Sequence, residues 1–226
     1  MPTYKNLPDD ELLPLIKTHL FSAIIGDILD QLGYRHVFLP PRVRALSDDM
    51  VMAGRAMPVL QVDLPEDAPA DRKMFGVMLE ALDDLKPNEV YLAAGGTPDY
   101  AVWGELMATR AKWLGAAGAV MDGWARDAAG IIKIGFPTFA HGSYAKDQGP
   151  RGEAADFRLS VHIGKVVIHP GDLVFGDRDG VLIVPKEAEE EALTRAFEKL
   201  EGENTVRIAI ENGMSTVEAF KKYGVM

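Results

Sequence analysis

Apolar residues recur along the chain at two spacings, and these predict its central elements. Over residues 105 to 114, Leu106, Met107 and Leu114 recur at helical spacing, and Gly115 follows as a stop. Residues 90 to 94 and 118 to 123 are short, continuous apolar runs, as in strands that are buried on both faces. The order predicts a strand, a helix and a second strand joined in a parallel crossover unit.

Charged residues stand at the two ends of this unit. Glu105 opens the helix, and the pair Arg126-Asp127 follows the second strand after an interval of twenty residues. Ten helical residues travel ~15 Å in one direction, and the strand travels ~17–20 Å back. Because open α/β sheets bind ligands at the edge where strands end and helices begin, we expect these three side chains to lie close together.

The remaining elements follow from periodicity and from turn residues. We expect an N-terminal helix interrupted near Pro14, a second helix with Ser22 as its N-cap, and a last short helix capped by Ser215. The helices are expected over residues 9 to 20, 23 to 32, 71 to 85 and 186 to 212. Residues 51 to 62 are expected to form one long irregular strand or two short ones, and residues 137 to 140 a short strand. A polar loop is expected over residues 141 to 158 and a β-meander over residues 159 to 184.

This partition predicts one domain over residues 1 to 226. Its N-terminal helices occupy residues 1 to 35, and a helical tail occupies residues 186 to 226. The turn at residues 177 to 180 is predicted to be a β-turn, because it lacks the later ligands of a calcium loop.

Composition narrows the classes of function. The 226 residues carry a net charge of −10 and no cysteine, which argues against a general nucleic-acid binder and excludes thiolate catalysis, disulfides and cysteine-based zinc sites. There is no apolar run of 18 residues, no signal-peptide core and no glycine-rich nucleotide motif. We expect a soluble, cytoplasmic protein with no membrane and no nucleic-acid partner.

The residues at the crossover ends suit metal-assisted chemistry on a 2-oxo acid. Glu105 and Asp127 offer the oxygen ligands that Mg²⁺ and Mn²⁺ prefer, and Arg126 offers a fork for a carboxylate. The backbone amides of residues 104 to 107 add an anion site at a helix N-terminus. A metal ion there would act as a Lewis acid on the ketone and stabilise an enolate. An Arg-Asp pair after a strand can equally be a surface salt bridge, and the spacing leaves both interpretations open.

The whole pattern resembles a known family. The stretch from Gly104-Glu105-Leu106-Met107 to Arg126-Asp127 is similar to the 4-hydroxy-4-methyl-2-oxoglutarate aldolases of the RraA-like superfamily. Further segments carry the resemblance along nearly the whole chain: residues 22 to 30, 54 to 56, 170 to 172, 176 to 181 and 206 to 226. The resemblance implies an α/β fold of the β/β/α swivelling type with a helical C-terminal tail, assembled as homotrimers or homohexamers with active sites between subunits.

The resemblance also implies an activity and residue roles. The activity is class II pyruvate-aldolase chemistry: a lyase dependent on Mg²⁺ or Mn²⁺ that cleaves 4-hydroxy-2-oxo acids of the 4-hydroxy-4-methyl-2-oxoglutarate type to pyruvate, together with oxaloacetate decarboxylation. Arg126 would bind pyruvate, Asp127 would ligate the metal directly, and Glu105, standing where an Asp is common, would reach it through water. The pyruvate carboxylate would be bound by the amides of Gly104, Glu105, Leu106 and Met107.

A neighbouring subunit would complete the site. The candidates are Asp27 from the N-terminal segment and Glu203, or Glu201, from the tail. His141, at the start of the polar loop, is either structural or a general acid or base. Trp103 and Trp124 flank the motif and are expected to be packing groups.

Two other functions compete with this one. The chain could be an RraA-like regulatory protein that binds a ribonuclease, or a hydratase or tautomerase on the same scaffold. The RraA regulator lacks the Asp of the Arg-Asp pair, whereas this chain has Asp127. That difference favours an enzyme.

Overall fold

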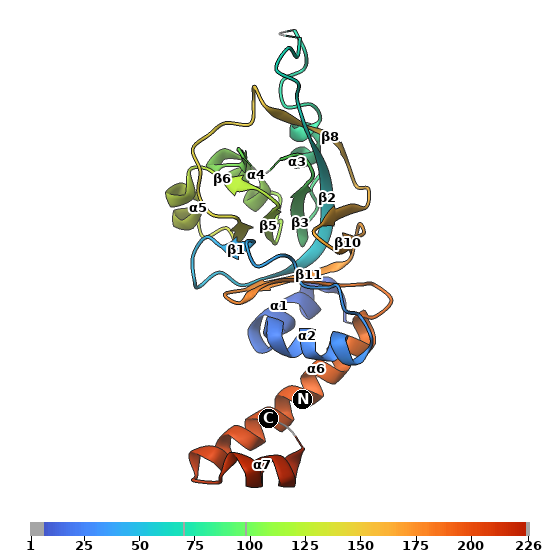
Figure 1. Ribbon diagram of the computed structural model, residues 1–226, viewed down its shortest axis with the longest axis vertical. Coiled ribbons are helices and arrows are strands. Elements are labelled where there is room, and N and C mark those ends of the chain that lie inside the picture. Colours follow the sequence, from blue (N-terminus) through green and yellow to red (C-terminus); the bar gives the residue numbers. More distant parts are fainter. Residues whose placement is uncertain (1–6, 70, 98, 225–226) are drawn as a thin grey trace.

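A nearly closed, barrel-like sheet with helices on its outside forms the body of this mixed α/β protein (Figure 1). The computed structural model describes residues 7–69, 71–97 and 99–224. The helices are α1 (Asp9–His19), α2 (Ser22–Gln31), α3 (Met78–Asp83), α4 (Glu105–Trp113), α5 (Ala128–Ile134), α6 (Glu189–Glu211) and α7 (Thr216–Tyr223). The strands are β1 (Arg44–Ala45), β2 (Met52–Asp63), β3 (Glu89–Ala94), β4 (Ala101–Trp103), β5 (Gly118–Met121), β6 (Trp124–Ala125), β7 (Thr138–Ala140), β8 (Gly152–Phe157), β9 (Val161–Ile163), β10 (Val166–Ile168), β11 (Leu173–Asp177) and β12 (Gly180–Val184).

The long strand β2 organises the sheet, whose order is β1-β7-β5-β3-β2-β11-β12. Strands β2, β3, β5 and β7 run parallel. The first part of β2 pairs with β11 and its last part pairs with β8, both antiparallel. The segment before β1 bonds to β12, since Leu39 N–H donates to Val181 and Ile183 N–H donates to Val37. This pairing brings the two ends of the sheet together.

The alternation of side chains along each strand separates an interior from an outer face. On β3, Val90 and Leu92 join the core inside the sheet, whereas Tyr91 and Ala93 join a second core beneath α3, α4 and α5. On β11 the outward Phe175 joins a third core beneath α1, α2 and α6. Strands β3 and β11 therefore bury apolar side chains on both faces, which is why each contains a continuous apolar run in the sequence.

The C-terminal helices extend away from the body. Helix α6 begins against α2, and its far half runs outward to α7, which folds back along it (Figure 1). Ser215 caps α7 in a capping box with Glu218, which confirms the prediction for this residue. No single helix in the described ranges is long and apolar enough to cross a membrane. Helices α1 and α2 taken together would be, by length and composition alone, but they are bent by 104° relative to each other.

Two predictions for the N-terminal helices were wrong. Helix α1 continues through Pro14, because residues on both sides of it, Leu13 and Ile16, are buried in one core. Ser22 is the first helical residue of α2 rather than its N-cap, and its hydroxyl and amide both donate to the Asp177 carboxylate. The end of α2 agrees with the prediction, since Gly33 adopts a left-handed φ of 92°.

Two predictions around β8 were also wrong. The helix expected over residues 71 to 85 is reduced to α3, because Phe75 and Gly76 have left-handed φ values of 67° and 61° and the segment bonds to Ala154 through the Phe75 carbonyl and the Val77 amide. The loop expected over residues 141 to 158 ends in strand β8, which pairs with β2. By contrast, the turn at residues 177 to 180 joins β11 and β12 as a tight hairpin, as predicted.

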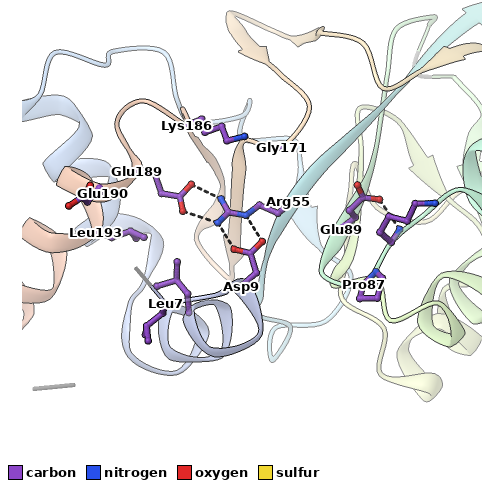
Figure 2. A pocket seen from close by; sticks show the side chains of 12 residues that line it. Leu7, Asp9, Arg55, Pro87, Glu89, Gly171, Lys186, Glu189, Glu190 and Leu193 are labelled. Carbon is purple, nitrogen blue, oxygen red and sulfur yellow. Dashed lines mark hydrogen bonds and ion pairs between the residues drawn. The ribbon is translucent and has the colours of Figure 1, made fainter. Parts of the chain in front are cut away.

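Arg55 of β2 fastens two helices to the sheet (Figure 2). Its guanidinium donates to Asp9, the first residue of α1, and to Glu189, the first residue of α6, over Nε–Oδ2 and Nη2–Oε1 distances of 2.9 Å each. The arginine side chain is 20% exposed. Carboxylates at helix N-termini are also favoured by the helix dipoles. One side chain therefore pairs with two carboxylates and holds both helices.

The contacts of Arg55 with Asp9 and Glu189 form what we call the Arg55 clamp, and replacing Arg55 tests it. Arg55→Met is expected to lower the free energy of unfolding by about 2 kcal/mol, because it leaves two half-buried carboxylates unpaired. The matched control, Arg178→Met, breaks an ion pair with Asp48 in which both side chains are more than two-thirds exposed, and should cost less than about 0.5 kcal/mol. Equal losses of unfolding free energy in the two variants, measured by urea titration, would show that the Arg55 clamp does not stabilise the fold.

The same clamp has a pH signature. Hydrogen bonds from Arg55 hold the pKa of Asp9 below its usual value. The stability that this pair contributes is fully present above the pKa of an unfolded Asp, about 3.9, and is lost as the pH falls through the lower, folded pKa. The stability difference between wild type and Arg55→Met should therefore shrink when urea titrations are repeated at progressively lower pH below about 4.

Candidate functional site

A short parallel strand pair brings the two halves of the motif together. Strands β4 and β6 pair in parallel, and Arg126 N–H donates to the Trp103 carbonyl over 2.8 Å. A Cβ on Gly104 would lie 3.0 Å from Asp127 Oδ2 and 3.3 Å from Arg126 Cγ. The Arg126-Asp127 pair therefore contacts the start of α4, as the spacing predicts.

Glu105, the first residue of α4, lies on the α5 side of this pair. Its carboxylate lies against α5, because a Cβ on Gly130 would be 2.3 Å from both its Cδ and its Oε2. Gly130 stands three residues after Asp127, so the Glu105 carboxylate lies within one helical turn of Asp127. Both side chains are exposed.

Asp127 adopts an uncommon backbone conformation. As the N-cap of α5 it has φ 56° and ψ 33°, in the left-handed region, where non-glycine residues are rare. Hydrogen bonds from Gly130 and Ile131 to its carbonyl hold it there. Its side chain does not cap its own helix and lies across Gly104 instead. Such strain, of about 1–2 kcal/mol, clusters at functional residues.

Arg126 is held between two carboxylates. Nη1 donates to Asp147 Oδ1 over 2.6 Å, and Nε lies 3.6 Å from Asp127 Oδ2. Asp147 is placed by backbone contacts of its loop with β4: Ala101 N–H donates to the Lys146 carbonyl, and Ala101 and Asp147 form a bridge. Asp147 is not among the residues predicted from the sequence, where its one signal is a polar loop long enough to flank a site.

Arg126, Asp127 and Asp147 line a cleft of about 410 Å³. Its walls come from the segment around α3, from β4 and the start of α4, and from the loop that follows β7. The lining residues are Phe75, Met78, Leu79, Ala101, Val102, Trp103, Gly104, Leu106, Met107, Arg126, Asp127, Asp147 and Gln148. The first amides of α4 have no partner within the helix, and no side chain caps them. An anion at this end of the cleft would meet free N–H groups and a guanidinium.

The donor set suits a hard cation. Asp127 is 46% exposed and Glu105 is also accessible, so both carboxylates can bind an ion that keeps several waters, as Mg²⁺ does. Within the described ranges no three His, Asp or Glu side chains are grouped as a metal-binding cluster. The residues therefore fit an ion held by one or two carboxylates and water.

The candidates for a neighbouring subunit lie elsewhere. Asp27 on α2 and Glu203 on α6 both contact Lys199, which lies 3.6 Å from Glu203 Oε1. Glu201 is exposed on the same helix. These helices cover the β11–β12 side of the barrel, away from α4 and α5 (Figure 1). Within one chain the structure does not bring these acids to Asp127.

His141 lies outside the cleft lining. Its Nε2 is 3.0 Å from Asp122 Oδ1, and Arg42 Nε donates to the same nitrogen over 3.1 Å. The ring is only 6% exposed and packs edge-on against Trp124. Burial lowers its pKa despite the nearby carboxylate. These contacts favour a structural role.

A second cavity, of about 670 Å³, lies beside Arg55 (Figure 2). The sticks show that the Arg55 guanidinium faces Asp9 and Glu189 rather than open space. Because two carboxylates already accept hydrogen bonds from this guanidinium and neutralise its charge, Arg55 is not available to bind an anion. The cleft at Arg126 is the better candidate.

A family model described as "RraA-like: Aldolase/RraA" matches residues 22–183, which include the whole cleft. The chain belongs to the RraA-like family. The match confirms the resemblance predicted from the motif, and the nearly closed sheet with C-terminal helices confirms the predicted fold class.

Individual relatives carry two kinds of name. "Putative 4-hydroxy-4-methyl-2-oxoglutarate aldolase" of Halalkalibacterium halodurans is 32% identical over 63% of this chain and 68% of its own length. Protein DlpA of Legionella pneumophila is 27% identical over 98% of this chain, which spans only 36% of DlpA. Among solved structures, Streptomyces coelicolor RraAS2, named as an unusual member of the RNase ES inhibitor RraA protein family, aligns with a TM-score of 0.77 at 27% identity, covering 88% of this chain and 97% of RraAS2. The RraA-like family thus includes both aldolase names and regulator names.

Gly130 offers a test of the geometry around Glu105. Gly130→Ala adds a Cβ where the Glu105 carboxylate lies, yet it favours helix α5 by up to about 1 kcal/mol. We expect the melting temperature to stay equal or rise, while the affinity for Mn²⁺, measured by electron paramagnetic resonance, falls about tenfold, in line with loss of an outer-shell partner. Unchanged Mn²⁺ affinity would show that Glu105 does not act at the ion.

Proposed function

We propose that the protein is a divalent-metal-dependent carbon–carbon lyase that cleaves 4-hydroxy-2-oxo acids to pyruvate and also decarboxylates oxaloacetate. The observation that carries the proposal is the meeting of Arg126 and the exposed, strained Asp127 at the uncapped N-terminus of α4. This arrangement combines an anion site and a ligand for a hard cation in one cleft. A 2-oxo acid presents the matching groups, a carboxylate beside a ketone.

Each residue has a role in this reaction. The amides of Gly104 to Met107 and the Arg126 guanidinium bind the pyruvyl end and orient it. Asp127 would hold Mg²⁺ or Mn²⁺, and Glu105 would act through a water molecule. The bound ion supplies Lewis acidity toward the ketone oxygen. The C3–C4 bond then breaks as the C4 hydroxyl loses its proton to the water held by Glu105, and a proton returns to C3 to give the methyl group of pyruvate.

The assembly is part of the proposal. We propose a homotrimer or homohexamer in which Asp27 and Glu203 of one subunit approach the cleft of the next. The C-terminal helices support an interface, since Ile208, Val217 and Phe220 are each more than half exposed on α6 and α7. Apolar side chains gathered on a protruding arm favour contact with a second copy.

The activity can be tested directly. Pyruvate release from 4-hydroxy-4-methyl-2-oxoglutarate and from oxaloacetate is expected with Mg²⁺ or Mn²⁺ and should vanish with EDTA. Asp127→Asn and Arg126→Met should each lower kcat/KM at least about 100-fold, the scale of losing one preorganised charge stabiliser. Asp156→Asn, an exposed acid on β8, is the control and should keep full activity. Wild-type rates in Asp127→Asn would refute the residue assignment.

The same variants separate the competing functions. Catalytic silence of the wild type with both metals, combined with co-purification of a ribonuclease, would favour a regulator, the function in the name of RraAS2. Conversion of 2-oxo acids without carbon–carbon cleavage would point to a hydratase or tautomerase.

The interface is tested by changing one exposed apolar residue. Phe220→Glu is expected to shift the mass measured by light scattering from a trimer or hexamer toward the monomer, because a charge would have to be buried without a partner. Lys221→Glu, exposed on the next position of α7, is the control and should leave the mass unchanged. An oligomer that persists in Phe220→Glu would place the interface elsewhere.

A further inference from the structure

The cleft at Arg126 has one polar end and one apolar end. Arg126, Asp127 and Asp147 lie at the polar end, next to the start of α4. The rest of the wall is largely apolar and comes from the segment around α3 and from α4: Phe75, Met78, Leu79, Leu106 and Met107. Among the described residues that line the cleft, Arg126 is the one cation.

This lining points to a substrate class. Resting on the proposed function, we infer that the distal half of the substrate, beyond C4, is uncharged and apolar. The preferred substrates are then 4-hydroxy-2-oxo acids with an alkyl group on C4. This class departs from the dicarboxylic acid in the name of the Halalkalibacterium halodurans relative.

The charges in the cleft argue against a second carboxylate. A desolvated carboxylate needs a cation or several donors. Arg126 Nη1 already donates to Asp147 Oδ1 over 2.6 Å, and its guanidinium would also bind the pyruvyl end of the substrate. Asp147 also adds a negative charge beside the path to the apolar wall, which would repel a distal carboxylate. An alkyl group meets no such penalty.

The apolar wall is held in place by a strained segment. Phe75 has a left-handed φ of 67°, rare for a bulky residue. Two hydrogen bonds fix the segment to β8: Ala154 N–H donates to the Phe75 carbonyl and Val77 N–H donates to the Ala154 carbonyl. Phe75 Cε1 would lie 3.4 Å from a Cβ on Gly149, so the ring packs on the turn that carries Asp147. Strain of this kind persists only where the surroundings fix it and is common in ligand clamps.

Two large side chains of this wall still have apolar surface to bury. Leu79 is 55% exposed and Leu106 is 85% exposed. Covering such surface with an alkyl group is favourable, whereas covering it with a carboxylate would dehydrate the charge. The wall therefore contributes to binding only if the distal half is apolar.

The experiment compares substrates that differ at one group. 4-Hydroxy-2-oxoglutarate and 4-hydroxy-2-oxopentanoate differ only in a carboxylate or a methyl on C4. In both, the C3–C4 bond breaks, the hydroxyl proton is lost and C3 is protonated, which gives pyruvate with glyoxylate or acetaldehyde. We expect kcat/KM to be at least about tenfold higher for the methyl compound, consistent with discrimination by an unpaired polar group. Lengthening the alkyl chain to the hexanoate and heptanoate should raise kcat/KM about two- to fourfold per methylene.

A charge placed on the wall should change this preference. Leu79→Lys supplies a cation at the apolar end and is expected to shift the kcat/KM ratio toward 4-hydroxy-2-oxoglutarate at least about tenfold, as a charge-assisted hydrogen bond would. Leu79→Gln, similar in size and uncharged, is the matched control and should not raise turnover of the dicarboxylate. An equal shift in both variants would overturn the charge argument.

Exchange of the pyruvate methyl protons in D₂O with Mn²⁺ reports the chemistry at the polar end alone, since pyruvate has no distal half. If exchange occurs but wild type cleaves the dicarboxylate as well or better, the inference is wrong while the proposed function stands. If exchange and all cleavage are absent, the proposed function and the inference both fail.

Discussion

The candidate site depends on one backbone hydrogen bond, from Arg126 N–H to the Trp103 carbonyl. It pairs the ends of β4 and β6, after which α4 begins at Glu105 and α5 begins at Ala128. Trp103 is fixed by burial, and its ring packs against Tyr91 and Phe136 with centroids 5.0 and 6.1 Å away. Because the core holds this tryptophan, the starts of two helices are held side by side, and side chains twenty residues apart share one volume.

The charges gathered there are unbalanced. The Arg126 guanidinium faces two carboxylates, those of Asp147 and Asp127, and a third, that of Glu105, lies nearby against α5, so carboxylates outnumber cations around the polar end of the cleft. Such a cluster is costly on its own and becomes favourable with a cation present, which is the state expected of a metal-dependent site. Arg55 also faces two carboxylates, those of Asp9 and Glu189. Both accept hydrogen bonds from its guanidinium, so all three groups are occupied in holding α1 and α6 to the sheet. The cleft at Arg126 differs because the Asp127 carboxylate and the first amides of α4 remain free to bind a ligand.

The sequence predicted the crossover unit well, because its signals are local. Apolar periodicity over residues 105 to 114 and the runs on either side are enough to place α4 between two parallel strands. The convergence of Glu105 with Arg126 and Asp127 then follows from lengths alone. The capping box at Ser215 is equally local.

The failures come from contacts between distant segments. The helical spacing of Met74, Val77 and Met78 could not show that Phe75 adopts a left-handed φ and that its carbonyl bonds to Ala154 of β8. β8 itself is an edge strand, so its exposed positions hide the apolar alternation. Asp147 could not be predicted because a bridge to Ala101 positions it. The acids Asp27 and Glu203 stay predictions, since only a second subunit could bring them to the cleft.

A crystal structure with Mn²⁺ and oxalate, whose two adjacent carboxylates imitate the carboxylate and ketone oxygens of a 2-oxo acid, would show directly whether the cleft holds a metal ion and a substrate together. We expect an anomalous peak for Mn²⁺ next to the Asp127 carboxylate, with oxalate between the ion and the first amides of α4, and Arg126 turned from Asp147 toward the oxalate. An ion bound elsewhere, for example beside Arg55, or an oxalate that leaves the Arg126–Asp147 pair and the start of α4 without contact, would contradict this expectation.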